Sequence, residues 1–327
     1  MNNKKLYNIG KTEDGMQIQK YLREAGFSKA QIRSMKFMED GICVNGQRER
    51  VTAVLKAGDV LEVLLAMKEG ASSHLLSLEK MPEILYEDED VIAVNKPAGI
   101  AVHPSHGHYL DTLSNQLAYY FRMSGQRVEV HSIGRLDLET SGIVLFAKHR
   151  AAAARLSAQR EAGVLRKQYF AICSGTFEQK RGCHRSAIAP LPGSLMKMCV
   201  SETGKRAVTY FEVEKQYPHA ALVRLELKTG RTHQIRVHMA DAGHPLLGDR
   251  LYGIVEEVQT EMCAPHLGEG KQYGSQMQRA ALHAGKMTFR QPFCEKEVIV
   301  AAPFPEDMQI CLEQLEDVLK NELENRR

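Results

Sequence analysis

Short apolar runs, each bounded by polar or turn-forming residues, recur over most of the 327-residue chain. Runs of this kind, rich in Val, Ile and Phe, are typical of strands buried in a sheet. Stretches in which apolar residues recur every three or four positions indicate amphipathic helices instead. The first pattern predicts strands at 91–94, 143–147, 167–172, 209–213, 221–227 and 298–300, and the second predicts helices at 113–120, 151–159, 232–243 and 308–319.

The pattern also divides the chain into two parts. Residues 11–65 contain two short helical stretches and the hairpin-forming pair Asn45-Gly46, which together predict a small α/β unit. Residues 66–82 are polar and carry Gly, Ser and Pro, a composition that is common in linkers between domains. We therefore predict two domains, a small one at 1–75 and a larger one at 76–327.

The run at 134–142 gathers chemically active side chains directly before one of the predicted buried strands. It contains Arg135, Asp137 and Glu139 together with two hydroxyls. A loop that is held by a buried strand keeps its shape while it stays accessible to solvent, and such loops often carry function. Asp137 is our candidate for the key carboxylate. The alternative is a surface pair of Arg135 and Asp137 in an ordinary turn.

Composition narrows the class of protein. The net charge is +3 and 43% of the residues are hydrophobic, so the chain is an ordinary globular protein and any basic surface is local. Seven cysteines and a polar start indicate a reducing cytoplasm, and no apolar run approaches the ~20 residues of a membrane span. No metal is predicted, because two groups lack the spacing of metal ligands: His103, His106 and His108, and Cys183, His184 and Cys199.

Several ordered strings resemble one enzyme family. Gly-Arg-Leu-Asp-x-x-Thr-Ser-Gly at 134–142 is similar to the signature loop of the RluA-type RNA pseudouridine synthases. This family commonly has His where Gly134 stands, so the subfamily stays open. The further strings are Asn-Lys-Pro-x-Gly at 95–99, Lys-x-Tyr at 167–169, Thr-Gly-Arg-Thr-His-Gln-Ile-Arg-Val-His at 229–238 and His-Pro-Leu-Leu-Gly-Asp at 244–249.

The resemblance implies an α+β fold with a mixed, mostly antiparallel central sheet, flanking helices and a catalytic cleft. It implies conversion of uridine in RNA to pseudouridine without a cofactor. In this family the residue at Asp137 is the nucleophile or key carboxylate, the residue at Arg236 pairs with it, and the ring at Tyr169 stacks on a flipped-out uridine. Arg135 is implied to brace the gap that the flipped base leaves. Whether Asp137 attacks the sugar or assists proton removal stays open.

The first unit resembles the RNA-binding domain of ribosomal protein S4. In that family a basic helix lies against RNA, where cations neutralise phosphates without reading the sequence. The corresponding cations lie on the two predicted helices of this chain: Lys20, Arg23, Lys29, Arg33 and Lys36. The alternative is an ordinary solvated helix face.

We therefore predict an RNA-uridine isomerase that is monomeric and cytoplasmic, with large-subunit ribosomal RNA as its partner and no DNA or membrane. One alternative is a non-catalytic RNA-binding assembly factor, and another is a pseudouridine synthase that acts on transfer RNA. A third is a hydrolase that uses Asp137 as general acid with Glu139 or another carboxylate as its partner, which would release free uracil.

Overall fold

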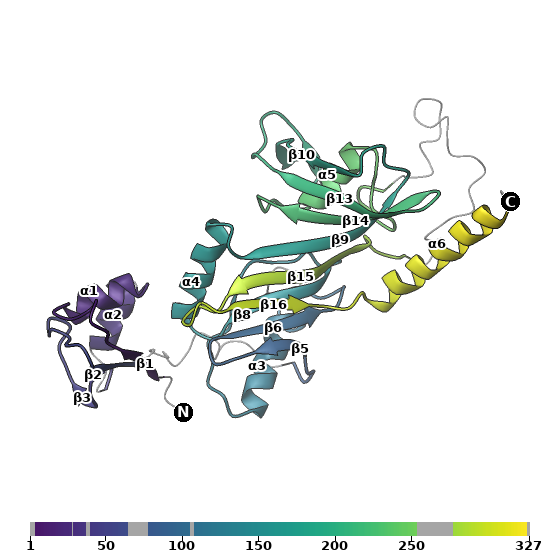
Figure 1. The fold of residues 1–327 in the computed structure, drawn as a ribbon. Helices are drawn as coiled ribbons and strands as arrows, with labels where there is room; N and C mark the ends of the chain where they lie inside the picture. The colour runs from purple at the N-terminus through teal and green to yellow at the C-terminus, as the bar shows by residue number, and fades with distance from the viewer. Residues whose placement is uncertain are drawn as a thin grey trace.

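The computed structural model describes residues 4–27, 29–36, 40–64, 78–104, 108–253 and 277–325. These residues form two units, each with its own sheet and apolar core (Figure 1). Most of the predicted linker lies outside the described residues, so the domain boundary between 75 and 76 stays a prediction.

The N-terminal unit is a small α/β fold with a four-stranded antiparallel sheet in the order β1-β4-β2-β3. Asn45 and Gly46 have φ of 51° and 77°, the left-handed conformations that a tight hairpin turn requires. The elements are β1 (Lys4–Asn8), α1 (Ile18–Glu24), α2 (Lys29–Lys36), β2 (Ile42–Val44), β3 (Gln47–Arg48) and β4 (Val60–Leu64).

The larger unit is built on a ten-stranded sheet with the main order β10-β13-β14-β9-β15-β8-β6-β5, to which β16 adds beside β15 and β7 beside β8. The pair of β8 and β15 is parallel and the other pairs are antiparallel, so the predicted mixed, mostly antiparallel sheet is confirmed. The strands are β5 (Glu83–Glu87), β6 (Val91–Lys96), β7 (His131–Ser132), β8 (Ser141–Ala147), β9 (Arg166–Ser174), β10 (Arg181–His184), β13 (Thr209–Gln216), β14 (Ala220–Leu227), β15 (Leu282–Arg290) and β16 (Glu297–Ala301). A separate hairpin pairs β11 (Ile188–Pro190) with β12 (Met198–Val200).

Strand β8 is buried on both faces, which explains its uninterrupted apolar run. Successive side chains of a strand point to opposite faces. Ile143 and Leu145 pack in the core that contains Leu156 of α4 (Arg150–Glu161). Val144 and Phe146 pack in the core that contains α3 (Leu113–Met123). The strand is therefore a rigid support for the loop that precedes it.

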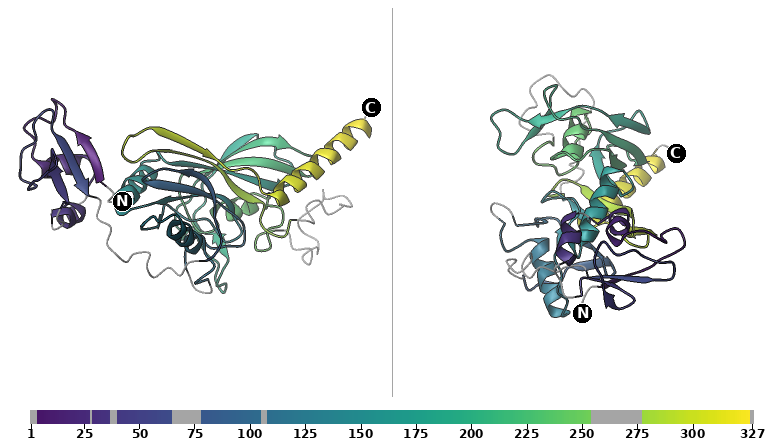
Figure 2. Two further views of the ribbon diagram at one scale, coloured as in Figure 1. Left: turned by 90° about the horizontal axis from the view of Figure 1, so that it is seen from below. Right: turned by 90° about the vertical axis from the view of Figure 1, so that its left-hand side faces the viewer.

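Two further helices complete the larger unit. The short helix α5 (Gln234–Asp241) packs on the β9 and β14 side of the sheet through Ile235 and Met239. The long helix α6 (Glu306–Asn325) buries Met308, Cys311 and Leu315, and it extends from the end of the molecule opposite the N-terminal unit (Figures 1 and 2). In the part of the chain that the structure describes, no helix combines the length and apolar character needed to cross a membrane.

The N-terminal unit contacts the larger unit beside α4. The guanidinium of Arg155 lies over two rings, 5.5 Å from the centroid of Phe27 and 4.2 Å from that of Phe293. Ala151 of α4 belongs to the apolar core of the N-terminal unit. The contact therefore buries apolar surface from both units and stacks a cation between their aromatic side chains.

A buried carboxylate, Asp90, adds a polar link at the same contact. Its oxygens accept hydrogen bonds from the Lys5 amine (2.7 Å), the His149 Nε2 (2.8 Å) and the Gln291 amide (2.6 Å). Burial alone would raise the pKa of Asp90, but the hydrogen bonds from His149 and Lys5 outweigh it and hold the pKa below the ordinary value. Asp90 is therefore an ionised anchor that joins the two units.

Replacing Asp90 with Ala tests this anchor. We expect Asp90→Ala to lower the free energy of unfolding by about 3–5 kcal/mol, because it leaves buried donors without an acceptor. Urea denaturation measures this change, and limited proteolysis should cut the N-terminal unit faster.

The matched control is Glu89→Ala. Its neighbouring carboxylate also lies near Lys5, at 3.4 Å, but 81% of its side chain is exposed, so stability should change by less than about 1 kcal/mol. Equal effects of the two substitutions would show that Asp90 is not an anchor.

Candidate active site

The loop that carries Asp137 joins β7 to β8, and packing fixes it at both ends. Leu136 is buried in the core beside α3, while 21% of the Asp137 side chain is exposed. At the other end Gly142 has a φ of +110°, and a Cβ there would lie 2.3 Å from the carbonyl oxygen of Ala284. A residue with a side chain does not fit so close an approach. The backbone around Asp137 therefore has little freedom to move.

Lys96 holds the same loop from inside the protein. Its side chain is fully buried, and its Nζ donates hydrogen bonds to the carbonyl oxygens of Pro97 (2.9 Å), Ile100 (2.8 Å) and Leu138 (3.1 Å). One ammonium thus ties the turn after β6 to the loop that carries Asp137. Burial lowers the pKa of Lys96 to about 7, and the negative charge of Asp137 partly opposes this shift. Lys96 is a structural residue here.

Tyr169 lies on β9 and packs against two apolar cores of the larger unit. Burial raises the pKa of Tyr169 far above its ordinary value, and the negative charge of Asp137 raises it further. Tyr169 packs against the same apolar cluster as Leu136, the residue before Asp137. Because its pKa is raised, the phenol keeps its proton at neutral pH and is a hydrogen-bond donor.

Arg236 lies on α5 with 3% of its side chain exposed, and its partner is not the predicted one. Its Nε and Nη2 donate to the two oxygens of Asp249 at 2.7 and 2.6 Å, a bidentate pair. Its Nη2 also lies 3.1 Å from Glu139. The predicted direct pair of Arg236 with Asp137 is therefore wrong for this structure, although the charge of Asp137 contributes to the raised pKa of Arg236 after Asp249 and Glu139.

Burial explains why Arg236 pairs with Asp249 and not with Asp137. The Asp249 side chain is fully buried and also accepts the backbone N–H groups of Leu251 (2.9 Å) and Tyr252 (3.1 Å). A buried carboxylate is costly unless charged donors surround it. Asp137 is partly solvated and does not need such a partner. Asp249 is part of the string at 244–249, but the sequence analysis gave it no role.

His233 is a site residue that the sequence analysis missed. It precedes α5 in the left-handed conformation, with φ of 54°, which is rare without glycine and is often found at functional sites. Its Nδ1 lies 2.8 Å from the hydroxyl of Tyr252, and that hydroxyl accepts the N–H of Met198 at 2.8 Å. The Tyr252 hydroxyl thus links His233, before α5, to Met198 at the start of β12.

The electrostatics place His233 beside the loop. Burial lowers the pKa of His233, and the negative charge of Asp137 offsets part of the shift. The imidazole is therefore neutral at neutral pH, with one N–H to donate. Arg135 is exposed, in contrast to the buried Arg236. It exposes 76% of its side chain, and its Nη2 lies 3.9 Å from Asp137. The charge of Asp137 thus influences the pKa of Tyr169, Arg236 and His233, and Arg236 also contacts Glu139 of the same loop.

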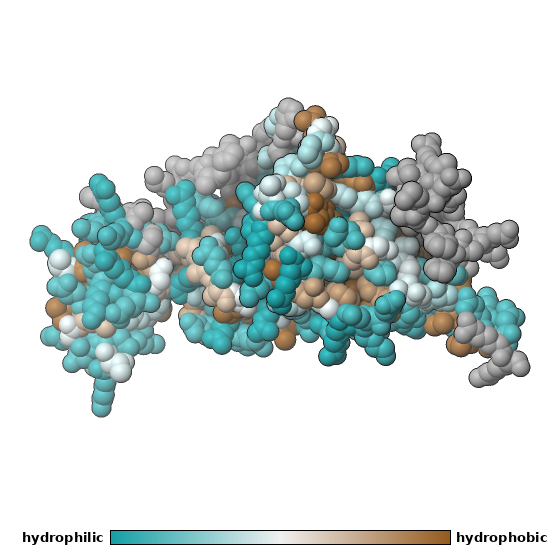
Figure 3. All heavy atoms as spheres, turned by 90° about the horizontal axis from the view of Figure 1, so that it is seen from above, coloured by the Kyte–Doolittle hydropathy of each residue, from teal (hydrophilic) through white to brown (hydrophobic). Residues whose placement is uncertain are grey.

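The five cations predicted to bind RNA are all exposed on the two helices of the N-terminal unit: Lys20, Arg23, Lys29, Arg33 and Lys36. Lys20 lies 3.9 Å from Glu24, a weak surface pair. Seen from above, hydrophilic side chains dominate this unit, at the left in Figure 3. The surface is therefore available to a charged partner, but it is separate from the loop with Asp137.

No group of three or more His, Cys, Asp or Glu side chains among the described residues is arranged to hold a metal ion. His106, one of the three histidines considered in the sequence, lies outside those residues. His103 hydrogen bonds to the hydroxyls of Ser132 and Ser114 instead. The structural role of His103 is thus to link the β7 strand to α3.

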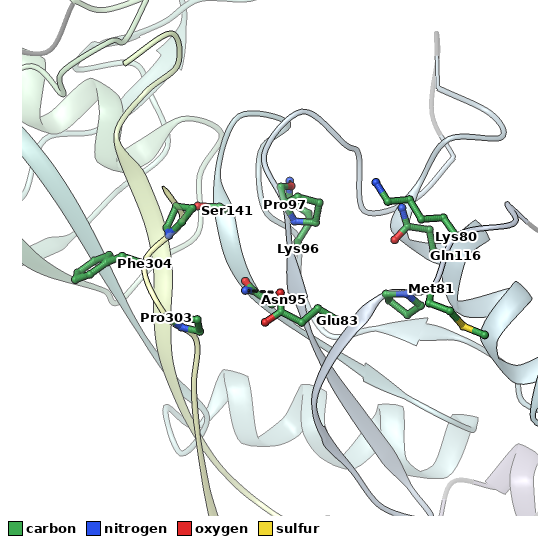
Figure 4. Close-up of a pocket in the computed structure, with 12 residues that line it drawn as sticks. Lys80, Met81, Glu83, Asn95, Lys96, Pro97, Gln116, Ser141, Pro303 and Phe304 are labelled. Atoms are coloured by element: carbon green, nitrogen blue, oxygen red, sulfur yellow. Dashed lines mark hydrogen bonds between the residues drawn. The ribbon is translucent and has the colours of Figure 1, made fainter. Parts of the chain in front are cut away.

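A hollow of about 390 Å³ lies between the start of β5, the turn after β6 and the segment before α6. Figure 4 shows Lys80 toward one end and Phe304 toward the other, with a hydrogen bond from Asn95 to Glu83 (3.1 Å) between them. Asp137, Tyr169 and Arg236 do not line this hollow. The hollow adjoins the loop only through Lys96 and Ser141, which are part of its lining.

Comparisons of the sequence and of the fold with known proteins agree on one family. Residues 90–241 match the family model described as RNA pseudouridylate synthase. The uncharacterised RNA pseudouridine synthase YjbO of Bacillus subtilis is 36% identical, over 90% of this chain and 97% of its own length. The ribosomal large subunit pseudouridine synthase D of Xylella fastidiosa is 34% identical, over 80% of this chain and 82% of its own. The solved structure of human RNA pseudouridylate synthase domain containing 4 covers 72% of this chain and 93% of its own, with a TM-score of 0.57 and 25% identity.

The pair of Arg236 and Asp249 can be tested without an activity assay. Arg236→Lys keeps the charge but cannot form the bidentate contact, so we expect a loss of about 1–3 kcal/mol in the free energy of unfolding. Urea denaturation measures it. The control is Arg290→Lys, whose exposed pair with Glu295 at 3.8 Å should contribute less than about 1 kcal/mol. A similar small change in both variants would argue against the importance of the buried pair.

Proposed function

The chain belongs to the RluA-type RNA pseudouridine synthases, and we propose that it isomerises uridines in large-subunit ribosomal RNA. The relative from Xylella fastidiosa, which is named for the large ribosomal subunit, supports this substrate because its match extends over most of both chains. Membership in an enzyme family disfavours the non-catalytic assembly factor. Transfer RNA is the alternative substrate.

The proposed reaction is an isomerisation. The bond between N1 of uracil and C1′ of the ribose breaks, the base turns, and C5 forms a new bond to C1′. The proton on C5 leaves and N1 gains one, so the substrate and the product have the same atoms and electrons. Such a reaction requires a carboxylate, a route for one proton and a place for the turned base, and it requires no oxidant or phosphate donor.

The observation that supports this proposal most strongly is that Leu136, next to Asp137, and Tyr169 pack in the same apolar cluster, where the charge of Asp137 raises the pKa of Tyr169. In the proposal the Asp137 carboxylate acts at the sugar or assists the proton removal. It suits this role because it is partly exposed and, among the described residues, its ion-pair partner is the exposed Arg135 at 3.9 Å. A carboxylate held by buried donors, such as Asp249, would be less free to react.

The other predicted residues receive supporting roles. The Tyr169 ring lies against the flipped uracil, and its protonated hydroxyl relays the proton between C5 and the base nitrogen. Arg236 contributes positive charge near Asp137 and shapes the site through its contacts with Asp249 and Glu139. The exposed Arg135 braces the gap that the uridine leaves, since extruding a base costs a few kcal/mol of stacking and pairing.

The proposal also covers the oligomeric state of the enzyme, its compartment and the role of its N-terminal unit. We infer a monomer in the cytoplasm whose N-terminal unit resembles the S4 RNA-binding domain and holds RNA through the cations of α1 and α2. This inference is supported by their exposure and by the contacts of the N-terminal unit with the catalytic unit at Asp90. DNA, a metal and a cofactor have no part in the proposed reaction.

Asp137→Asn tests the assigned carboxylate. The amide cannot act as nucleophile or base, so pseudouridine formation in transcribed large-subunit ribosomal RNA should fall by at least ~10³-fold while RNA binding changes little. Pseudouridine mapping and equilibrium binding measure the two quantities. Asp317→Asn, on the exposed part of α6, is the control that keeps the same change in charge. Activity retained in Asp137→Asn would refute the assignment, and release of free uracil by the wild type would favour the hydrolase.

A second test concerns α2. Replacing Lys29, Arg33 and Lys36 with Gln should reduce the slope of log affinity against log salt by about 2–3, because each phosphate contact contributes ~0.7–0.9. Lys56→Gln, in the exposed turn before β4, is a single-site control and should leave the slope unchanged. An unchanged slope in the triple variant would mean that α2 is only a solvated surface.

A further inference from the structure

Two cations lie beside different parts of the candidate active site, Arg160 beside Gly134 of the loop and Lys167 beside the ring of Tyr169. Arg160 is in the last turn of α4, and a Cβ on Gly134 would lie 3.5 Å from its Nη1. Lys167 is the second residue of β9, and its Nζ lies 5.9 Å from the centroid of the Tyr169 ring. One cation therefore borders the loop that carries Asp137, and the other borders the ring of the second candidate catalytic residue.

Neither cation has an anionic partner among the described residues. The other two arginines of α4 are engaged, since Arg150 pairs with Glu129 at 3.1 Å and Arg155 donates to the carbonyl of Pro292 at 2.6 Å. Arg160 makes no comparable contact within the described chain. Arg150 and Arg155 thus stabilise the fold, and Arg160 lies beside the candidate active site.

The two cations also repel each other. Burial lowers the pKa of Lys167 to about 8, and the positive charge of Arg160 lowers it further. A half-buried lysine next to an arginine without a neutralising carboxylate is unfavourable in the free protein. An anion bound between them would offset this repulsion and raise the pKa of Lys167 again.

We propose that Arg160 and Lys167 bind a backbone phosphate of the RNA directly beside the flipped uridine. This inference rests on the proposed function and assigns one contact in its complex. A phosphate suits the pair because a guanidinium binds two of its oxygens and an ammonium binds a third as a point charge. Gly134 contributes by having no side chain, so the backbone of the substrate can approach Arg160 across the loop.

The geometry of the sheet supplies a matched control. In the pairing of β9 with β15, Lys167 lies opposite Met287 and Gln168 lies opposite Lys286. Because side chains alternate between the faces of a strand, Lys286 faces the other side of the sheet from Lys167. Lys286 is exposed, so Lys286→Gln removes the same charge one position away without touching the proposed phosphate site.

The first experiment measures binding of the full-length variants to transcribed large-subunit ribosomal RNA over a series of salt concentrations. The slope of log affinity against log salt should decrease by about one for Arg160→Gln and by about two for the double variant with Lys167→Gln. The KM for RNA should rise while kcat stays close to that of the wild type, because a phosphate contact is equally present before and during the reaction. Lys286→Gln should match the wild type in both respects.

The second experiment locates the phosphate. A short RNA that contains the mapped target uridine is made with a neutral methylphosphonate at the linkage on its 5′ or its 3′ side. One of these replacements should weaken binding to the wild type and have little effect on the double variant.

The outcomes separate this inference from the proposed function. A wild-type salt slope in the double variant, an equal loss in Lys286→Gln, or equal sensitivity of both proteins to the methylphosphonate would overturn the phosphate site. These are measurements of binding and do not require turnover. Absence of pseudouridine from the product RNA of the wild type would instead overturn the proposed function.

Discussion

The burial of β8 on both faces is the constraint on which the site depends. Its side chains alternate between a core under α4 and a core under α3, so the strand cannot shift by one residue without moving every side chain into the wrong core. The close approach of Gly142 to Ala284 then fixes the start of the strand against β15. The strand holds the loop before it in place, and Lys96 holds this loop further through three hydrogen bonds to carbonyl oxygens. A reactive carboxylate on such a loop is held in place without being buried.

The degree of burial also distinguishes the structural carboxylates Asp90 and Asp249 from the candidate catalytic carboxylate Asp137. Asp90 and Asp249 have fully buried side chains, and each is surrounded by several hydrogen-bond donors. Asp137 is partly exposed, with an exposed arginine as its nearest ion-pair partner among the described residues. The physical reason is that an ionised carboxylate loses its hydration when buried and needs charged or N–H donors in compensation. A carboxylate that keeps some water can exchange it for a substrate.

The sequence predicted the elements of this fold well, because the period of the apolar residues is a local property of the chain. The strands that contain 143–147 and 167–172, the helix on 151–159 and the C-terminal helix are all present. The site was predicted in part. Asp137 and Tyr169 were named from their strings, and Tyr169 packs in the same cluster as Leu136 of the Asp137 loop, whereas the predicted partner of Arg236 was wrong and His233 with Tyr252 was missed. Whether the named residues perform the assigned steps stays a prediction.

By itself the sequence determined which segments form strands and helices and which chemical groups precede the central strand, since both follow from neighbouring residues. The tertiary structure alone decided which carboxylate Arg236 holds, which side chain orients His233, and that Arg160 lies beside Gly134. Those contacts join residues that are distant in the chain, and they depend on how deeply each group is buried. Burial is a property of the packed molecule, so no local pattern of residues specifies it.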